Sequence, residues 1–161
     1  MPIYATNGAK LYIGAAIVDK DTDFQASDFT SQTWVEVKRT EALGSLGDAA
    51  SEISIDLIDR GRTQRLKGTR SGGSMEVVCG IDYADAGQIA LLAAEKSREN
   101  FAFRLVLNDA PASGTPSERM FIAMVASAVE AFDTANNVMK LNASLWVNSN
   151  VVKVNAALTG G

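Results

Sequence analysis

The sequence predicts a mainly β protein: a single-domain β-sandwich or barrel with one packed α-helix and a long basic loop. Most ordered segments alternate apolar and polar residues, which is the pattern of a half-buried strand. One segment, residues 85–100, instead has apolar residues at helical spacing. The chain has 161 residues, 47% hydrophobic and 21% charged, enough for one domain with a real core. We expect seven or eight strands that pack against the helix.

The predicted helix covers about residues 85–100, DAGQIALLAAEKSREN. Asp85 can cap the free N–H groups of its first turn, and Gln88 three residues later completes a capping-box pattern. Apolar residues at positions i, i+3 and i+4 share one face, which we expect to pack against the sheet. This predicted face consists of Ile89, Leu92 and Ala93.

Strands are predicted on both sides of the helix. Residues 34–38 and 53–57 alternate cleanly, and residues 74–80 resume the alternation. Residues 120–129 and 138–147 are predicted to form a hairpin around the turn at 133–137. Residues 19–33 are expected to form a polar loop anchored by two aromatic side chains, Phe24 and Phe29.

The segment from Asp59 to Gly73, DRGRTQRLKGTRSGG, interrupts the alternation. It combines five basic residues with four glycines, so we expect a long mobile loop. Three interpretations stay open: a solvated loop, a nucleic-acid patch, or a loop that docks on an acidic surface of a neighbouring copy. The basic residues are Arg60, Arg62, Arg65, Lys67 and Arg70.

The residues offer little for catalysis. The chain has no histidine, which removes histidine-based triads and histidine zinc sites. Its single cysteine, Cys79, alternates with apolar residues, which favours a buried structural thiol over a nucleophile. Asp56 and Glu76 occupy polar positions of alternating strands, as expected for a solvated face. We expect no enzyme, no metal and no cofactor.

Charge and hydropathy limit the partners. The net charge of −4 argues weakly against a dedicated nucleic-acid binder. No apolar run is long enough to cross a bilayer, so no membrane anchor is expected. Residues 11–18 resemble a first strand more than a signal peptide, because acidic residues follow where a cleavage site would lie. Synthesis in the cytosol is therefore expected.

Taken in order, these segments resemble a tail tube (major tail) protein of long-tailed, non-contractile bacteriophages. The likeness rests on the order of several stretches across about residues 34–150 and on no single motif. These stretches are Trp34-Val-Glu-Val, the strand Ile53–Ile58, the basic loop ending Lys67-Gly68, Gly87-Gln88-Ile-Ala-Leu-Leu on the helix, Phe101-Ala-Phe-Arg-Leu, Phe121, and Leu145-Trp-Val.

That family is similar in fold to the tube proteins of contractile tails and type VI secretion. The resemblance implies hexameric rings that stack into a tube and conduct DNA without specific binding. It also implies a virion component assembled in the host cytoplasm, with tape measure, tail tip and tail terminator proteins as partners. The loop 59–73 and two flexible arms, residues 1–8 and 151–161, would join adjacent rings.

A tube that passes DNA should have an acidic or neutral lumen, because basic side chains would bind phosphates. We expect the polar faces of the strongest strands to line it while the apolar faces pack beneath the helix. The lumen candidates are Glu36, Ser54, Asp56, Ser74 and Glu76. The inward-facing residues would be Val35, Val37, Ile53, Ile55, Leu57, Val77 and Cys79.

Two other classes remain as alternatives. One is a small β-rich binding module that uses the basic loop to hold nucleic acid or carbohydrate. The other is an enzyme of unrecognised type, which the missing histidine makes the least favoured. Oligomeric state separates a tube subunit from both.

Overall fold

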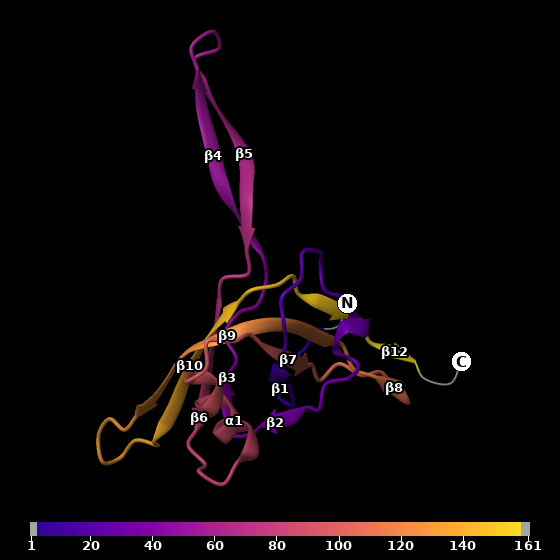
Figure 1. The fold of residues 1–161 in the computed structure, drawn as a ribbon, viewed down its shortest axis with the longest axis vertical. Helices are drawn as coiled ribbons and strands as arrows, with labels where there is room; N and C mark the ends of the chain where they lie inside the picture. Colours follow the sequence, from indigo (N-terminus) through magenta and orange to yellow (C-terminus); the bar gives the residue numbers. More distant parts are fainter. Residues whose placement is uncertain (1–2, 159–161) are drawn as a thin grey trace.

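A computed structural model describes residues 3–158, and over these the chain forms one eight-stranded sheet, two two-stranded sheets and a single α-helix (Figure 1). All strand pairs are antiparallel. The strands of the main sheet are β1 (Lys10–Ala16), β2 (Val35–Val37), β3 (Thr40–Ala42), β6 (Ser74–Gly80), β7 (Phe101–Val106), β9 (Glu118–Ala131), β10 (Lys140–Val147) and β11 (Val152–Val154). The other elements are the 3-10 helix η1 (Ala26–Phe29), β4 (Ala49–Leu57), β5 (Arg62–Ser71), α1 (Ala86–Glu95), β8 (Gly114–Thr115) and β12 (Ala157–Leu158).

The main sheet has the order β2-β1-β7-β9-β10-β6-β3, with β11 paired to β9. Because β2 and β3 are its two edges, the sheet is not a closed barrel. Only Lys38 and Arg39 separate these edges in sequence, and the backbone N–H of Gly80 on β6 donates to the Arg39 carbonyl at 2.8 Å. The two edges therefore converge at one corner of the sheet.

Helix α1 is tied to this corner by two buried polar side chains. The Asp85 carboxylate accepts from the backbone N–H groups of Gln88 and Lys38, each at 3.1 Å. The Gln88 side-chain amide donates to the carbonyls of Lys38 and Gly80 at 3.1 and 2.9 Å, and its oxygen accepts from the Asp82 N–H at 3.0 Å. The Gln88 residue is only 3% exposed, so these bonds satisfy groups that water cannot reach.

The helix confirms Asp85 as its N-cap but differs from the prediction in three respects. It ends at Glu95, and Gln88 bonds the sheet corner instead of closing a capping box. The predicted buried face is also wrong, because Ile89 is 52% exposed and Ala93 is exposed. The buried positions are Gly87, Gln88, Leu91 and Ala94.

The reason for the rotated face is a close approach at Gly87. A Cβ built on Gly87 would lie 2.2 Å from the Glu36 carbonyl oxygen and 2.5 Å from the Val37 Cα. Only a residue without a side chain lets the first turn of α1 rest on β2 at this distance. Leu91 and Ala94 then face the core, and Leu92 is partly buried.

The main core lies between α1 and one face of the sheet. Val37, Val77 and Cys79 are buried in it as predicted, and Val35 packs against it. Burial and the nearby Asp85 carboxylate raise the pKa of the Cys79 thiol to about 11. This agrees with a structural thiol that carries no nucleophilic role.

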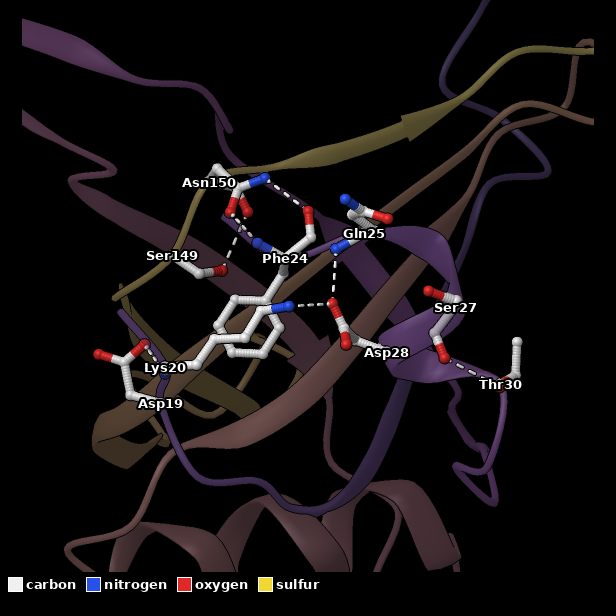
Figure 2. Close-up of polar contacts among 9 residues, drawn as sticks. All are labelled: Asp19, Lys20, Phe24, Gln25, Ser27, Asp28, Thr30, Ser149 and Asn150. Atoms are coloured by element: carbon white, nitrogen blue, oxygen red, sulfur yellow. Dashed lines mark hydrogen bonds and ion pairs between the residues drawn. The ribbon is translucent and has the colours of Figure 1, made fainter. Parts of the chain in front are cut away.

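The opposite face of the sheet is partly covered by the strap, which we define as residues 17–34. Phe24 and Phe29 anchor it and are 5% and 2% exposed, which confirms their predicted role. Figure 2 shows how Asn150 pins the strap: its amide accepts from the Phe24 N–H at 2.8 Å and donates to the Phe24 carbonyl at 3.0 Å. Lys20 lies over the Phe24 ring and donates to Asp28 at 2.7 Å.

The remaining predicted elements are the C-terminal hairpin and the two terminal arms. The hairpin of residues 120–147 is confirmed as β9 and β10. Within the expected C-terminal arm, residues 152–154 form β11 on β9, in agreement with a short last strand predicted at 151–154, and residues 157–158 form β12 on β8. The expected N-terminal arm ends in a turn at Gly8, whose φ is 90°, and residues 1–2 and 159–161 of the two arms lie outside the described residues.

We predict that Gly87→Ala destabilises the fold by about 1–3 kcal/mol, because the added methyl group meets backbone atoms that cannot yield without moving β2. The sign of this stability change tests the close approach, because replacing glycine by alanine in a helix ordinarily stabilises the protein by about 0.5–1 kcal/mol. Denaturant unfolding measures the change. Gly47→Ala is the matched control, because a Cβ at Gly47 would meet nothing within 4 Å, and its change should stay within about 0.5 kcal/mol. A more stable Gly87→Ala variant would contradict the close approach.

The hydrogen bonds of the strap make the stability of the protein depend on pH. Hydrogen bonds from Lys20 and then from the Gln25 N–H lower the pKa of Asp28 below its ordinary 3.8. A lowered folded-state pKa adds stability above pH 3.8 that is lost as the pH falls through the folded value. Asp28→Asn should therefore be less stable than the wild type at about pH 6, with the difference shrinking below pH 3.8. Urea unfolding at both pH values measures it, with Asp21→Asn as control; a difference that does not change with pH would refute the assignment.

Candidate assembly surface

The hairpin formed by β4 and β5 leaves the body of the protein and points into solvent (Figure 1). Its register pairs Ile53 with Leu66 and Asp56 with Thr63, and residues 58–61 make the turn. The prediction of a long loop at 59–73 is therefore wrong over residues 62–71, which form a strand. The turn itself uses Gly61, whose φ of 57° suits glycine.

The physical reason for this correction is cross-strand complementarity. Glu52 lies opposite Lys67, and Ser54 lies opposite Arg65. Opposite charges and hydroxyl groups on facing strands stabilise an antiparallel pair, and the Arg65 guanidinium also contacts Glu52 at 3.1 Å. The basic residues within β5 therefore occupy positions in register with the preceding strand, a signal visible only when both segments are compared.

The hairpin is anchored to the sheet at its base. β4 follows β3 and β5 precedes β6, and β3 and β6 are themselves paired at the edge of the sheet. The Val147 N–H of β10 donates to the Gly73 carbonyl at 3.0 Å, and the Arg70 guanidinium lies 3.6 Å from the Asp48 carboxylate. These contacts fix the point at which the hairpin leaves the body.

The two faces of the hairpin differ in chemistry. Because side chains alternate along a strand, one face carries Ile53, Ile55 and Leu66, and the other carries most of the charged residues. The three apolar side chains are 52%, 55% and 64% exposed, and Ile58 at the turn is 100% exposed. An exposed apolar stripe on a projecting element makes the hairpin a candidate interaction surface.

This exposure corrects a second prediction. Ile53, Ile55 and Leu57 alternate as expected but do not pack beneath α1, because β4 lies outside the main sheet. Ile53 and Ile55 are exposed and Leu57 is half-buried. Their apolar face has no partner within the described chain.

The five basic residues are distributed along the hairpin and do not form one cluster. Arg65 and Arg70 are paired with acidic residues of the same hairpin and its base. Arg60 lies in the turn and Arg62 next to it, and Lys67 lies in the middle of β5. None of these last three makes an ion pair with another residue of the described chain, so they are available to a partner.

The five lumen candidates fall in two places. Ser74 and Glu76 are exposed on β6, and Glu36 is half-buried on β2; all three point to the sheet face away from α1, since their neighbours enter the core. Ser54 and Asp56 instead lie on the polar face of the hairpin. The structure therefore does not bring the five residues together.

The open part of that sheet face is nearly free of charge. The Ser144 hydroxyl of β10 donates to Glu76 at 2.9 Å, and Trp146 beside Ser74 is 56% exposed. No lysine or arginine occurs among the central outward positions of the two strands. These positions are Ser74, Glu76, Val78, Asn142, Ser144 and Trp146.

Other kinds of site find no support in the described residues. No group of three or more cysteine, aspartate or glutamate side chains there is arranged to hold a metal ion. Within residues 3–158, no helix has the length and hydropathy needed to span a bilayer.

Comparison with known proteins gives a result at the level of the fold. No family model matches the sequence, and no curated protein matches it. Among solved structures, the SPP1 tail tube aligns with a TM-score of 0.62 at 19% identity, over 98% of this chain and 81% of that one. A chain in the baseplate of the anti-feeding prophage aligns with a TM-score of 0.67 at 12% identity, over 96% and 98% of the two chains.

A third structure extends the likeness. A chain in the virion of a native gene transfer agent aligns with a TM-score of 0.61 at 13% identity, covering 93% of this chain and 99% of that one. This chain therefore shares its fold with the SPP1 tail tube and with chains of the anti-feeding prophage baseplate and the gene transfer agent virion, which confirms the fold relationship predicted from the sequence. The structures that share this fold belong to a phage tail tube, a baseplate and the virion of a gene transfer agent.

Proposed function

We propose that this protein is the subunit of a phage tail tube, a structural protein that assembles with copies of itself. The observation that carries the proposal is a fold shared with the SPP1 tail tube over 98% of the chain. A projecting hairpin with an exposed apolar face supports it, because such a hairpin is suited to contact another copy. In the proposal, hexameric rings stack into a tube, and the hairpin joins adjacent rings.

The lumen of this tube would be formed by the sheet face away from α1. Its central outward residues on β6 and β10 are neutral or acidic, and Lys140 at the end of β10 is paired with Glu41, so DNA would pass without being held through its phosphates. Glu36, Ser74 and Glu76 keep their lumen assignment in this proposal. Ser54 and Asp56, on the hairpin, would face the lumen only where the hairpin crosses the joint between rings.

The wider setting follows from the same proposal. The protein would act in the virion tail after assembly in the host cytoplasm, with tape measure, tail tip and tail terminator proteins as partners. A monomeric binding module that uses the basic residues is less favoured, because two of the five are already paired within the hairpin and its base.

We predict that the purified protein forms hollow rings or tubes as its concentration rises, seen by negative-stain electron microscopy.

Ile53→Ser with Leu66→Ser should prevent tube growth, because it removes the apolar face of the hairpin. The monomer should keep its thermal midpoint, since both side chains are exposed. Val18→Ser is the control, because Val18 is 88% exposed but lies on the strap. A protein that stays monomeric and binds duplex DNA tightly at physiological salt would contradict the tube proposal.

We further predict that lysine on the proposed lumen makes the tube hold DNA. Ser74→Lys with Glu76→Lys should leave tubes intact but raise their affinity for a short DNA duplex at least about tenfold at low salt, with a steeper salt dependence. Fluorescence anisotropy of labelled duplex measures this. Ala93→Lys with Glu95→Lys adds the same charge at exposed positions of α1, on the other side of the sheet, and serves as control. Equal affinity for both variants would argue against the lumen assignment.

A further inference from the structure

The end of the molecule opposite the hairpin carries a second exposed apolar surface. Figure 1 places the turn between β9 and β10, together with α1, at the end of the long axis away from the hairpin. We call this surface the turn-end patch. Its apolar members are Tyr83, Ile89, Phe132, Val138 and Met139, which are between 45% and 67% exposed.

Contacts within the fold hold this patch together. The Ile81 N–H, at the end of β6, donates to the Met139 carbonyl at 3.1 Å. The Tyr83 hydroxyl lies 3.5 Å from the Glu130 carboxylate on β9. Tyr83, Ile89 and Glu130 also line a small hollow between α1 and β9. These contacts connect α1 and the loop before it to β9 and to the end of the β9–β10 turn.

The turn-end patch carries acidic side chains, whereas the tip of the hairpin carries basic ones. Residues 128–139 include Glu130 and Asp133 and no lysine or arginine, and the next residue, Lys140, is already paired with Glu41. At the other end of the molecule, Arg60 in the turn of the hairpin and Arg62 next to the turn outnumber Asp59 and lie close in sequence to the fully exposed Ile58. Apolar groups flanked by opposite charges thus occur at the two ends of one chain.

We propose that the turn-end patch is the receptor for the hairpin of another copy. In this contact Ile58 and the apolar face of the hairpin pack on Phe132, Val138 and their neighbours, while Arg60 and Arg62 face Glu130 and Asp133. Surfaces of different chemistry at opposite ends give a head-to-tail contact that repeats without closing, as a stacked tube requires. The inference rests on the proposed function and names the surface to which the hairpin binds.

Charge reversal tests the contact. The hairpin variant is Arg60→Glu with Arg62→Glu. The patch variant is Glu130→Lys with Asn136→Lys and Asp133→Asn; asparagine is used because Asp133 has a φ of 54°, which asparagine tolerates. Each variant alone should form no tubes. A chain that combines all five substitutions, or an equal mixture of the two variants, should form tubes again.

Two controls make the result specific. Lys10→Glu with Lys153→Glu changes the net charge as much as the hairpin variant does, at exposed positions outside both surfaces, and should form tubes like the wild type. In a mixture of Ile58→Cys and Phe132→Cys copies, mild oxidation should cross-link the two. Val18→Cys with Phe132→Cys should not cross-link, and the native Cys79 is buried and should stay silent.

The outcomes separate this inference from the function on which it rests. If the wild type forms tubes but the combined variant does not and no Ile58→Cys to Phe132→Cys cross-link appears, the receptor assignment is wrong and the tube proposal stands. If the wild type forms no tubes under any condition, the proposed function itself fails. Restored tubes together with the cross-link establish the contact.

Discussion

The arrangement of this protein depends on the buried hydrogen bonds that Asp85 and Gln88 make at one corner of the sheet. There β2 passes to β3 through Lys38 and Arg39, so the two edges of the sheet meet and leave backbone groups that no strand can pair. Gln88 bonds the carbonyls of Lys38 and Gly80, and Asp85 accepts the Lys38 N–H. Because an unpaired buried backbone group costs about 1–3 kcal/mol, these side chains allow the edges to converge without closing a barrel.

The same corner determines where the hairpin points. β3 and β6 pair at the sheet edge, and each is followed or preceded in the chain by one strand of the hairpin. The hairpin has no second layer of its own, and a two-stranded ribbon alone is at best marginally stable in water. Its order therefore depends on the ladder at its base, on the Arg70–Asp48 contact there, and on cross-strand pairs such as Glu52 and Lys67.

Local patterns in the sequence predicted elements whose partners lie close in the chain. Alternation identified β9 with β10 and the core residues Val77 and Cys79, and the cap at Asp85 was correct. The predictions are wrong where contacts between elements distant in the sequence determine the structure. The buried face of α1 depends on how closely Gly87 approaches β2, and the periodicity of apolar residues in the helix gives no information about this distance. The charges and glycines of β5 are typical of a loop and predict one. The structure forms a strand because the register places two of its basic residues opposite a polar and an acidic residue of β4.

The charges of the hairpin oppose non-specific association of its exposed apolar face. A flat ribbon with isoleucine and leucine on one face and two unpaired edges would ordinarily invite aggregation through those edges. Here Arg62 shares the apolar face, Arg60 sits at the turn, and Lys67 lies on the polar face of β5, so non-specific pairing brings like charges together. A surface that supplies carboxylates beside apolar groups removes this repulsion. In the proposed contact, the charges that oppose random association are also the charges that select the partner.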